Sequence, residues 1–98
     1  MMIVEFPEPN VMRLGGDVKT IENYVELKRR LTEFIASGEK ELTIEITDSM
    51  SINSSIIGFF TKIIHRDGIS LSLKVHDKKL YSLLCDLNLI KFFNVRQF

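Results

Sequence analysis

Two segments of the chain alternate strictly between apolar and polar residues, at residues 42–46 and 69–75. A period of two gives a strand one buried face and one solvent-facing face. Strands covered on both faces would instead be continuous apolar runs. We therefore predict two neighbouring strands of one sheet, with helices packed mainly on one face.

Three other segments carry apolar residues at helical spacing. The predicted helices cover about residues 17–37, 56–64 and 80–87. Asp17 and Asp77 are the predicted N-caps of the first and third helices, because a short acidic side chain can accept an unpaired backbone N–H. Gly38 and the pair Asp67-Gly68 are the predicted ends of the first and second helices.

Weaker patterns complete the order of elements. Residues 2–6 predict an edge strand that the Pro7-Glu8-Pro9-Asn10 turn ends, and residues 11–14 predict a second strand. The last apolar segment, residues 90–95, fits either a terminal strand or a packed tail. The pattern predicts a single α/β domain over residues 1–98, with a mixed sheet.

Composition narrows the class of protein. The chain has 98 residues, of which 45% are hydrophobic and 27% charged, as in ordinary globular domains. Thirteen basic and thirteen acidic residues cancel, whereas a dedicated nucleic-acid binder usually carries a basic surplus. A single cysteine, Cys85, fits a reducing compartment, and no apolar run could span a bilayer. We expect a cytoplasmic protein with no nucleic-acid partner and no membrane insertion.

Three short polar residues, Asn53, Ser54 and Ser55, stand between the strand at 42–46 and the following helix. The positive end of a helix dipole and its unpaired N–H groups can hold an anion, so a serine there can carry a phosphate. Simple helix capping is the structural alternative. The three residues also match the N-glycosylation sequon, which a cytoplasmic chain would not use.

An enzymatic role would need a base near Ser54, and only His65 and His76 are available. Eleven residues of continuous helix put His65 about 16 Å away along the axis. The histidines and Cys85 lack the close spacing of metal ligands. We therefore predict no enzyme, no metal and no cofactor, and we interpret Lys28-Arg29-Arg30 as a solvated helix face.

The order of elements and the serine turn together resemble the STAS family, the anti-sigma factor antagonist domain. The matching stretches are residues 11–16 (VMRLGG), 42–46 (LTIEI), 52–58 (INSSIIG), 68–73 (GISLSL) and 87–93 (LNLIKFF). Each motif is weak alone, but their order and spacing cover the chain from about Val11 to Val95.

The resemblance implies a protein-binding switch. Members of the family bind an anti-sigma factor that is also a serine kinase, and phosphorylation of the first serine of the turn breaks that complex until a phosphatase resets it. By position, Ser54 is the implied phosphoacceptor. The implied partner-binding residues are Asn53, Ser54, Ser55, Ile56 and Ile57.

The sequence departs from the family pattern in the turn. Asn53 replaces an aspartate beside the acceptor, and Ile56-Ile57 replaces a Gly-Leu pair. These changes favour the alternative of a constitutive STAS interaction module, an accessory subunit of a transport or signalling complex that is not phosphorylated.

The C-terminal segment is also expected to differ. Many family members continue into a further helix, so we expect Ile90, Phe92, Phe93 and Phe98 to be partly uncovered. Uncovered apolar side chains favour either self-association, for which a homodimer is the expected form, or binding of a partner.

Overall fold

The computed structural model describes residues 2–18 and 20–98. Its elements follow the chain in the order β1 (Ile3–Glu8), β2 (Val11–Gly15), α1 (Ile21–Ala36), β3 (Glu41–Ile46), α2 (Ser54–His65), β4 (Ser70–Val75), α3 (Lys78–Asp86) and β5 (Val95–Gln97). The five strands lie in one sheet in the order β1-β2-β3-β4-β5. The β1–β2 pair is antiparallel and the other three pairs are parallel, so the predicted mixed α/β sheet is confirmed.

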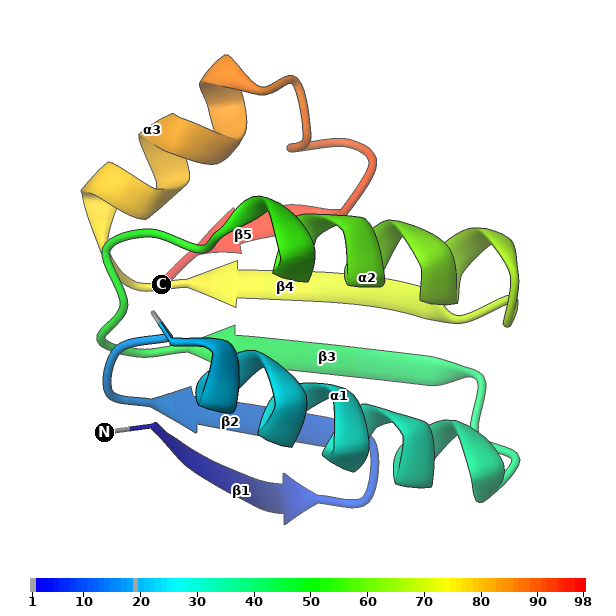
Figure 1. The fold of residues 1–98 in the computed structure, drawn as a ribbon. Coiled ribbons are helices and arrows are strands. Elements are labelled where there is room, and N and C mark those ends of the chain that lie inside the picture. Colours follow the sequence, from blue (N-terminus) through cyan, green and yellow to red (C-terminus); the bar gives the residue numbers. More distant parts are fainter. Residues whose placement is uncertain (1, 19) are drawn as a thin grey trace.

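The strand order explains why the helices gather on one face. From β2 to β5 each new strand is added beside the previous one, and the direction of growth never reverses. Crossovers between parallel strands are almost always right-handed, so successive helices fall on the same side of such a sheet. Figure 1 shows α1 and α2 side by side in front of the sheet, with α3 at its β5 end. The predicted packing mainly on one face is confirmed.

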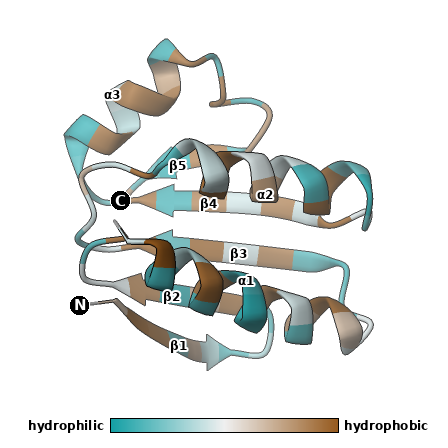
Figure 2. Ribbon diagram, in the orientation of Figure 1, coloured by the Kyte–Doolittle hydropathy of each residue, from teal (hydrophilic) through white to brown (hydrophobic). Residues whose placement is uncertain are grey.

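The core lies between this helix layer and the apolar rows of the sheet. Leu42, Ile44 and Ile46 of β3 pair with Leu71, Leu73 and Val75 of β4, and all six are buried. Figure 2 shows the alternation along both strands. Phe60 of α2 is fully buried against Phe93, with the ring centroids 5.9 Å apart in an edge-to-face arrangement. The two alternating segments are therefore adjacent strands with one buried face each, as predicted.

The opposite face of the sheet carries a row of charges. The strand register aligns Glu5, Arg13, Glu45, Lys74 and Arg96 across all five strands. Arg13 Nε lies 3.0 Å from Glu45 Oε1 in this row. Charged neighbours of mostly alternating sign are stable in water and costly to bury, which is why this face needs no second helix layer.

Helix α1 begins later than predicted. Its N-cap is Thr20 and not Asp17, because Thr20 and Asn23 form a reciprocal capping box. The Thr20 hydroxyl accepts the Asn23 N–H at 3.0 Å, and the Asn23 side-chain oxygen accepts the Thr20 N–H at 3.1 Å. The predicted N-cap of α3, Asp77, is correct.

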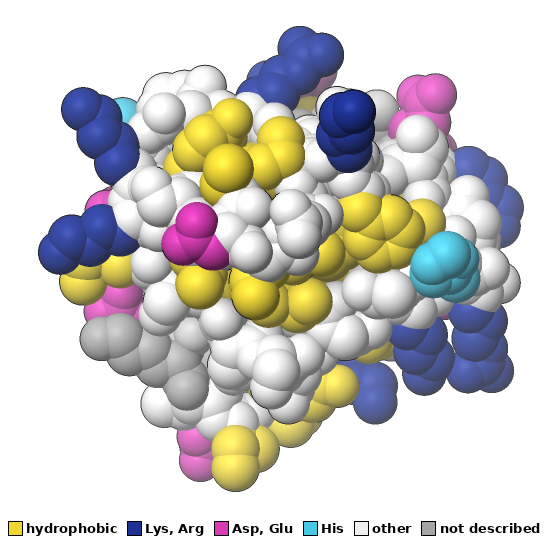
Figure 3. Space-filling model, turned by 90° about the horizontal axis from the view of Figure 1, so that it is seen from above, with side chains coloured by type: hydrophobic (Ala, Val, Ile, Leu, Met, Phe, Trp, Pro, Cys, Tyr) yellow, Lys and Arg dark blue, Asp and Glu magenta, His cyan; other side chains and the backbone are white. Residues whose placement is uncertain are grey.

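The C-terminal segment is mostly a turn and forms only a short strand. Asn88 and Asn94 have φ angles of 59° and 50°, a left-handed conformation that asparagine tolerates. The turn inserts Phe93 into the core, so the expectation that Phe93 is partly uncovered is wrong. Phe92 and Phe98 are exposed, as expected. Figure 3, which views the molecule from above Figure 1, shows hydrophobic side chains on this side in several separate groups.

None of the helices in the described part of the chain is both long enough and apolar enough to cross a membrane.

Candidate functional site

The polar cluster lies where the loop after β3 enters α2, and its first residue caps the helix. The Asn53 side-chain oxygen accepts the N–H of Ile56 at 2.9 Å. The Asn53 backbone oxygen accepts the N–H of Ile57 at 3.2 Å. Asn53 therefore supplies the capping that the sequence offered as the structural role of the whole cluster.

Ser54 and Ser55 are the first two residues of α2, and both are exposed. The Ser54 hydroxyl makes no hydrogen bond to any residue that the structure describes. The first turn of α2 contains no acidic side chain. The prediction that Ser54 is accessible at the start of a helix is confirmed, and its hydroxyl has no structural task there.

Ile56 is placed differently from the surface residue that the sequence predicted. It is 1% exposed and shares the core-facing side of α2 with Phe60 and Ile63. Positions 56, 60 and 63 follow helical spacing, so the face that buries Phe60 also buries Ile56. Ile57, on the next face, is half-buried. The predicted partner surface therefore keeps Ile57 and loses Ile56.

A buried serine ties the loop before α2 to the loop before α1. Ser49 is 1% exposed, and its hydroxyl donates to the Ser51 carbonyl at 2.7 Å. The same hydroxyl oxygen accepts the Val18 N–H at 3.3 Å. The two loops therefore share a buried hydrogen-bonded centre, which fixes the direction from which the chain enters α2.

Asp48 makes a second tie at the edge of the same loops. Its carboxylate accepts the Gly16 N–H at 2.8 Å and lies 3.2 Å from the Thr47 hydroxyl. These hydrogen bonds, the Gly16 bond first, and the nearby charge of His76 hold the pKa of Asp48 below its usual range. The folded structure therefore stabilises the negatively charged form of Asp48.

Exposed apolar side chains border these loops, and sequence reasoning missed them. Ile21 is 78% exposed, Val25 57% and Met50 47%. Met50 follows Ser49, which bonds Val18, and Ile21 lies three residues after Val18. The helical spacing that predicts a helix over residues 17–37 includes Ile21 among its apolar residues and does not separate it from the buried ones. The available signal was that Ile21 and Val25, one turn apart on the same helix face, form a second apolar pair separate from the buried Leu27, Leu31 and Phe34.

Candidate catalytic and metal-binding groups are not brought together. Ser54 and His65 are the first and last residues of α2. His76 Nδ1 is 2.6 Å from the Phe98 oxygen, and Cys85 is an exposed residue of α3. Within residues 2–18 and 20–98, no group of three His, Cys, Asp or Glu side chains could hold a metal ion.

Searches against known proteins add no relative to this picture: no protein-family model matches the chain, and no curated protein matches it. The structure by itself defines a small α/β domain with a mixed five-strand sheet.

Proposed function

We propose that this chain is a phosphorylation-controlled protein-binding switch of the STAS type, an anti-sigma factor antagonist that acts in the cytoplasm. One observation carries the proposal. Asn53 alone caps α2, and the adjacent Ser54 is exposed and its hydroxyl has no hydrogen-bond partner among the described residues. Its position in the turn is that of the family's phosphoacceptor.

The chemistry belongs to the partners, and the domain itself catalyses nothing. A serine kinase that is also the anti-sigma factor would transfer the γ-phosphoryl group of ATP to Ser54 Oγ, releasing ADP and the hydroxyl proton. Unpaired N–H groups in the first turn and the helix dipole favour a phosphate at this position. A phosphatase would hydrolyse the ester and restore the hydroxyl.

Added charge explains how the modification would release a partner. A phosphoserine carries about −1.5 to −2 charges near neutral pH. The partner surface that we infer combines Ser54, Ser55 and Ile57 with two exposed apolar side chains, Ile21 at the start of α1 and Met50 in the loop before α2. Desolvating a dianion among apolar contacts is costly, so the phosphorylated chain would bind more weakly.

A constitutive STAS module is the second candidate, and the exposed apolar residues favour it. Ile21, Val25 and Met50 can bind a partner without any change at Ser54. Asn53 is neutral where the family carries an acid, which alters the surroundings that a kinase would recognise. In this alternative the chain is an accessory subunit, bound permanently or to a second copy of itself.

The direct test is phosphorylation in vitro. The purified chain is incubated with ATP and purified anti-sigma serine kinases, and intact mass and peptide mapping are measured. We expect one added phosphate on Ser54, none on Ser54→Ala, and normal modification of the matched control Ser55→Ala. Modification of Ser55 alone would contradict the assignment of the acceptor.

Binding separates the two candidates. Calorimetric titration of the partner kinase should give equal affinities for the wild type and Ser54→Ala, and weaker binding for the phosphorylated chain and Ser54→Asp. Aspartate carries less charge than phosphate, so its effect should be the smaller one. Equal affinity of the genuinely phosphorylated chain would reject the switch in favour of the constitutive module.

A further inference from the structure

A shallow groove of about 170 Å³ runs between α1 and α2 on the outer side of the helix layer. Its apolar wall is formed by Ile35 of α1 and Phe59 of α2, whose ring is 7% exposed. Phe59 lies in the middle of α2, so the groove borders the second half of that helix and not the first turn that carries Ser54.

Three cationic side chains line this groove. Lys28 comes from α1, and Lys62 and Arg66 come from the end of α2. Among the described residues none of the three has an ion-pair partner closer than 4.0 Å. The only acid in the lining is Asp67, whose backbone oxygen accepts a hydrogen bond from Lys40 Nζ at 3.1 Å and so brings a fourth cation nearby.

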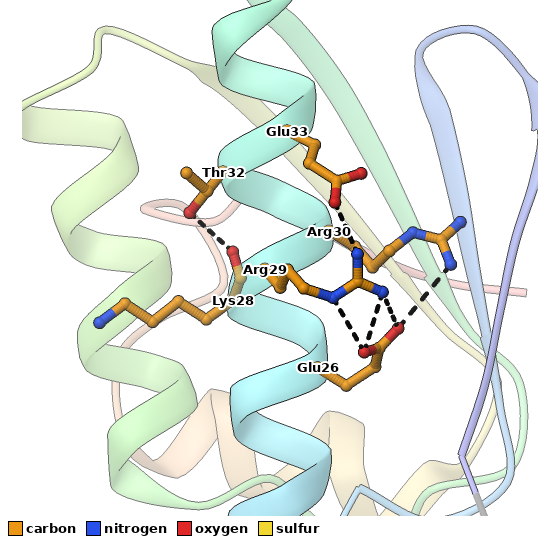
Figure 4. Close-up of polar contacts among 6 residues, drawn as sticks. All are labelled: Glu26, Lys28, Arg29, Arg30, Thr32 and Glu33. Atoms are coloured by element: carbon orange, nitrogen blue, oxygen red, sulfur yellow. Dashed lines mark hydrogen bonds and ion pairs between the residues drawn. The ribbon is translucent and has the colours of Figure 1, made fainter.

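Helix α1 separates paired charges from unpaired ones, as Figure 4 shows. On the side away from α2, Arg29 binds Glu26 at 2.8 Å and Glu33 at 2.6 Å, and Arg30 lies 3.9 Å from Glu26. Lys28 instead points toward α2, where none of the described acids forms an ion pair with it. In the basic run of α1, Arg29 and Arg30 are therefore paired with acids of the same helix, whereas Lys28 is not.

The helix dipole explains two of the groove's cations but not the third. Lys62 and Arg66 lie at the C-terminal end of α2, where positive side chains interact favourably with the dipole. Lys28 is in the middle of α1, two turns from either end. A positive charge there has no such local cause, and it adds to the other two across the groove.

We propose that this groove is a docking site for an acidic segment of a protein partner, in which a carboxylate side chain meets Lys28, Lys62 and Arg66 and an apolar neighbour packs on the half-buried Ile35. The three cationic side chains of the groove favour an acidic side chain on the partner by charge complementarity. The volume of the groove limits the size of its occupant. Sites for small organic ligands usually measure about 300–1,000 Å³, whereas this groove has room for one or two side chains.

Other occupants fit the groove less well. Single-stranded nucleic acid needs aromatic faces on which bases can stack, and the Phe59 ring is nearly buried. A lone inorganic anion would meet only side chains on an open surface, where ion pairs contribute little unless other contacts hold them. A peptide adds those contacts along the apolar wall.

The test uses the full chain and a synthetic peptide that alternates glutamate with leucine, next to a matched peptide with glutamine in place of glutamate. Backbone amide shifts of the ¹⁵N-labelled protein are followed during titration. We expect saturable changes centred on Thr32, Phe59 and Arg66 with the glutamate peptide, and much smaller ones with glutamine. Changes spread evenly over the molecule, or equal changes with both peptides, would overturn the proposal.

Charge reversal supplies the control. Lys28→Glu with Lys62→Glu should weaken binding of the glutamate peptide about tenfold or more, since each change replaces an attraction with a repulsion. Lys78→Glu with Lys79→Glu makes the same change in net charge on α3 and should alter affinity less than twofold. If both double variants weakened peptide binding equally, the effect would come from the overall charge of the protein, and the proposed site would be refuted. If the first pair fails to fold, Lys28→Gln with Lys62→Gln replaces it.

Two competitors separate the remaining occupants. Inorganic phosphate that reproduces the same shifts at similar concentration would make the groove a small-anion site instead. A single-stranded oligonucleotide that binds there more tightly than the peptide would make it a nucleic-acid surface. Because the assay needs neither Ser54 nor a kinase, its outcome does not depend on the proposed switch.

Discussion

Helices α1 and α2 start at the same end of the sheet, and both starts are rich in short polar residues, but those residues are used differently. At the start of α1, Thr20 and Asn23 cap each other through two reciprocal side-chain-to-backbone hydrogen bonds. At the start of α2, Asn53 alone does the capping. Ser54 follows it, exposed and without a hydrogen-bond partner among the described residues.

The comparison separates two roles that a polar cluster can have. A capping residue is identified by an accepted N–H, and at α1 both polar side chains meet that criterion. At α2 the criterion is met by Asn53 and not by Ser54. The Ser54 hydroxyl lies on a well-defined helix start but caps nothing there, so it is available to another protein.

The largest expected effect comes from Ser49, the residue that ties the two starts together. Ser49→Ala leaves the Val18 N–H and the Ser51 carbonyl without their buried partner, and unsatisfied buried groups cost about 1–3 kcal/mol. Urea unfolding should show that loss. Ser51→Ala is the control, because Ser51 contributes its backbone oxygen, and its effect should stay within about 0.5 kcal/mol. Equal losses of stability in the two variants would mean that the Ser49 hydrogen bonds do not hold the two loops together.

Removing the caps should affect the two starts alike. Thr20→Ala and Asn53→Ala should each lower the free energy of unfolding by about 1 kcal/mol, the usual cost of losing an N-cap. Ser54→Ala should change it by less than about 0.5 kcal/mol. Chemical denaturation of the three variants measures this directly. A loss at Ser54 as large as that at Asn53 would erase the distinction between the two roles.

Charge at Ser54 should move stability in a defined direction. Ser54→Asp adds a negative charge at the positive end of α2 and should stabilise the fold by about 0.3–1 kcal/mol, with Ser54→Lys shifting it the other way. Thermal and urea unfolding at low salt measure both variants. Destabilisation by Ser54→Asp would show that the first turn of α2 does not favour an anion.

The smallest effect is the pH dependence that Asp48 contributes. Its pKa is lower in the folded chain than in the unfolded one, so its stabilisation is complete above the ordinary aspartate pKa of about 3.9 and is lost as pH falls through the folded value. The wild type should therefore lose stability below about pH 4 more steeply than Asp48→Asn. Parallel acid-unfolding curves would contradict this assignment.

The same comparison shows how far the sequence could predict the structure. The start of α2 was predicted correctly because polar residues there stand directly before an apolar helical pattern. The start of α1 was misplaced because Asp17 follows two glycines and satisfies the usual cap signal, whereas Asn23 is not the glutamate or glutamine typical of a capping box.

Other differences arise where tertiary contacts decide. Asparagines that turn the chain left-handed bury Phe93 against Phe60, and no periodicity announces such a contact. For Ile56 the signal was present: it shares helical spacing with Phe60 and Ile63, whereas its neighbour Ile57 does not, so the periodicity of α2 indicates which of the two is buried. The groove between α1 and α2 could not be predicted from the sequence, because Lys28 lies within a continuous basic run. Only in the structure do the two arginines of that run pair with acids on their own helix while Lys28 does not.

The strand order has a consequence for how the chain is made. Because the strands occur in the sheet in the order in which they occur in the chain, each one emerging from the ribosome finds an open edge left by the strand before it. No strand must wait for a later one to be inserted between earlier neighbours. Phe93 emerges after α2, β4 and α3 and fills the site beside Phe60. Synthesis itself can therefore assemble the domain from one edge to the other, and the Phe60–Phe93 pair forms once the segment after α3 has emerged.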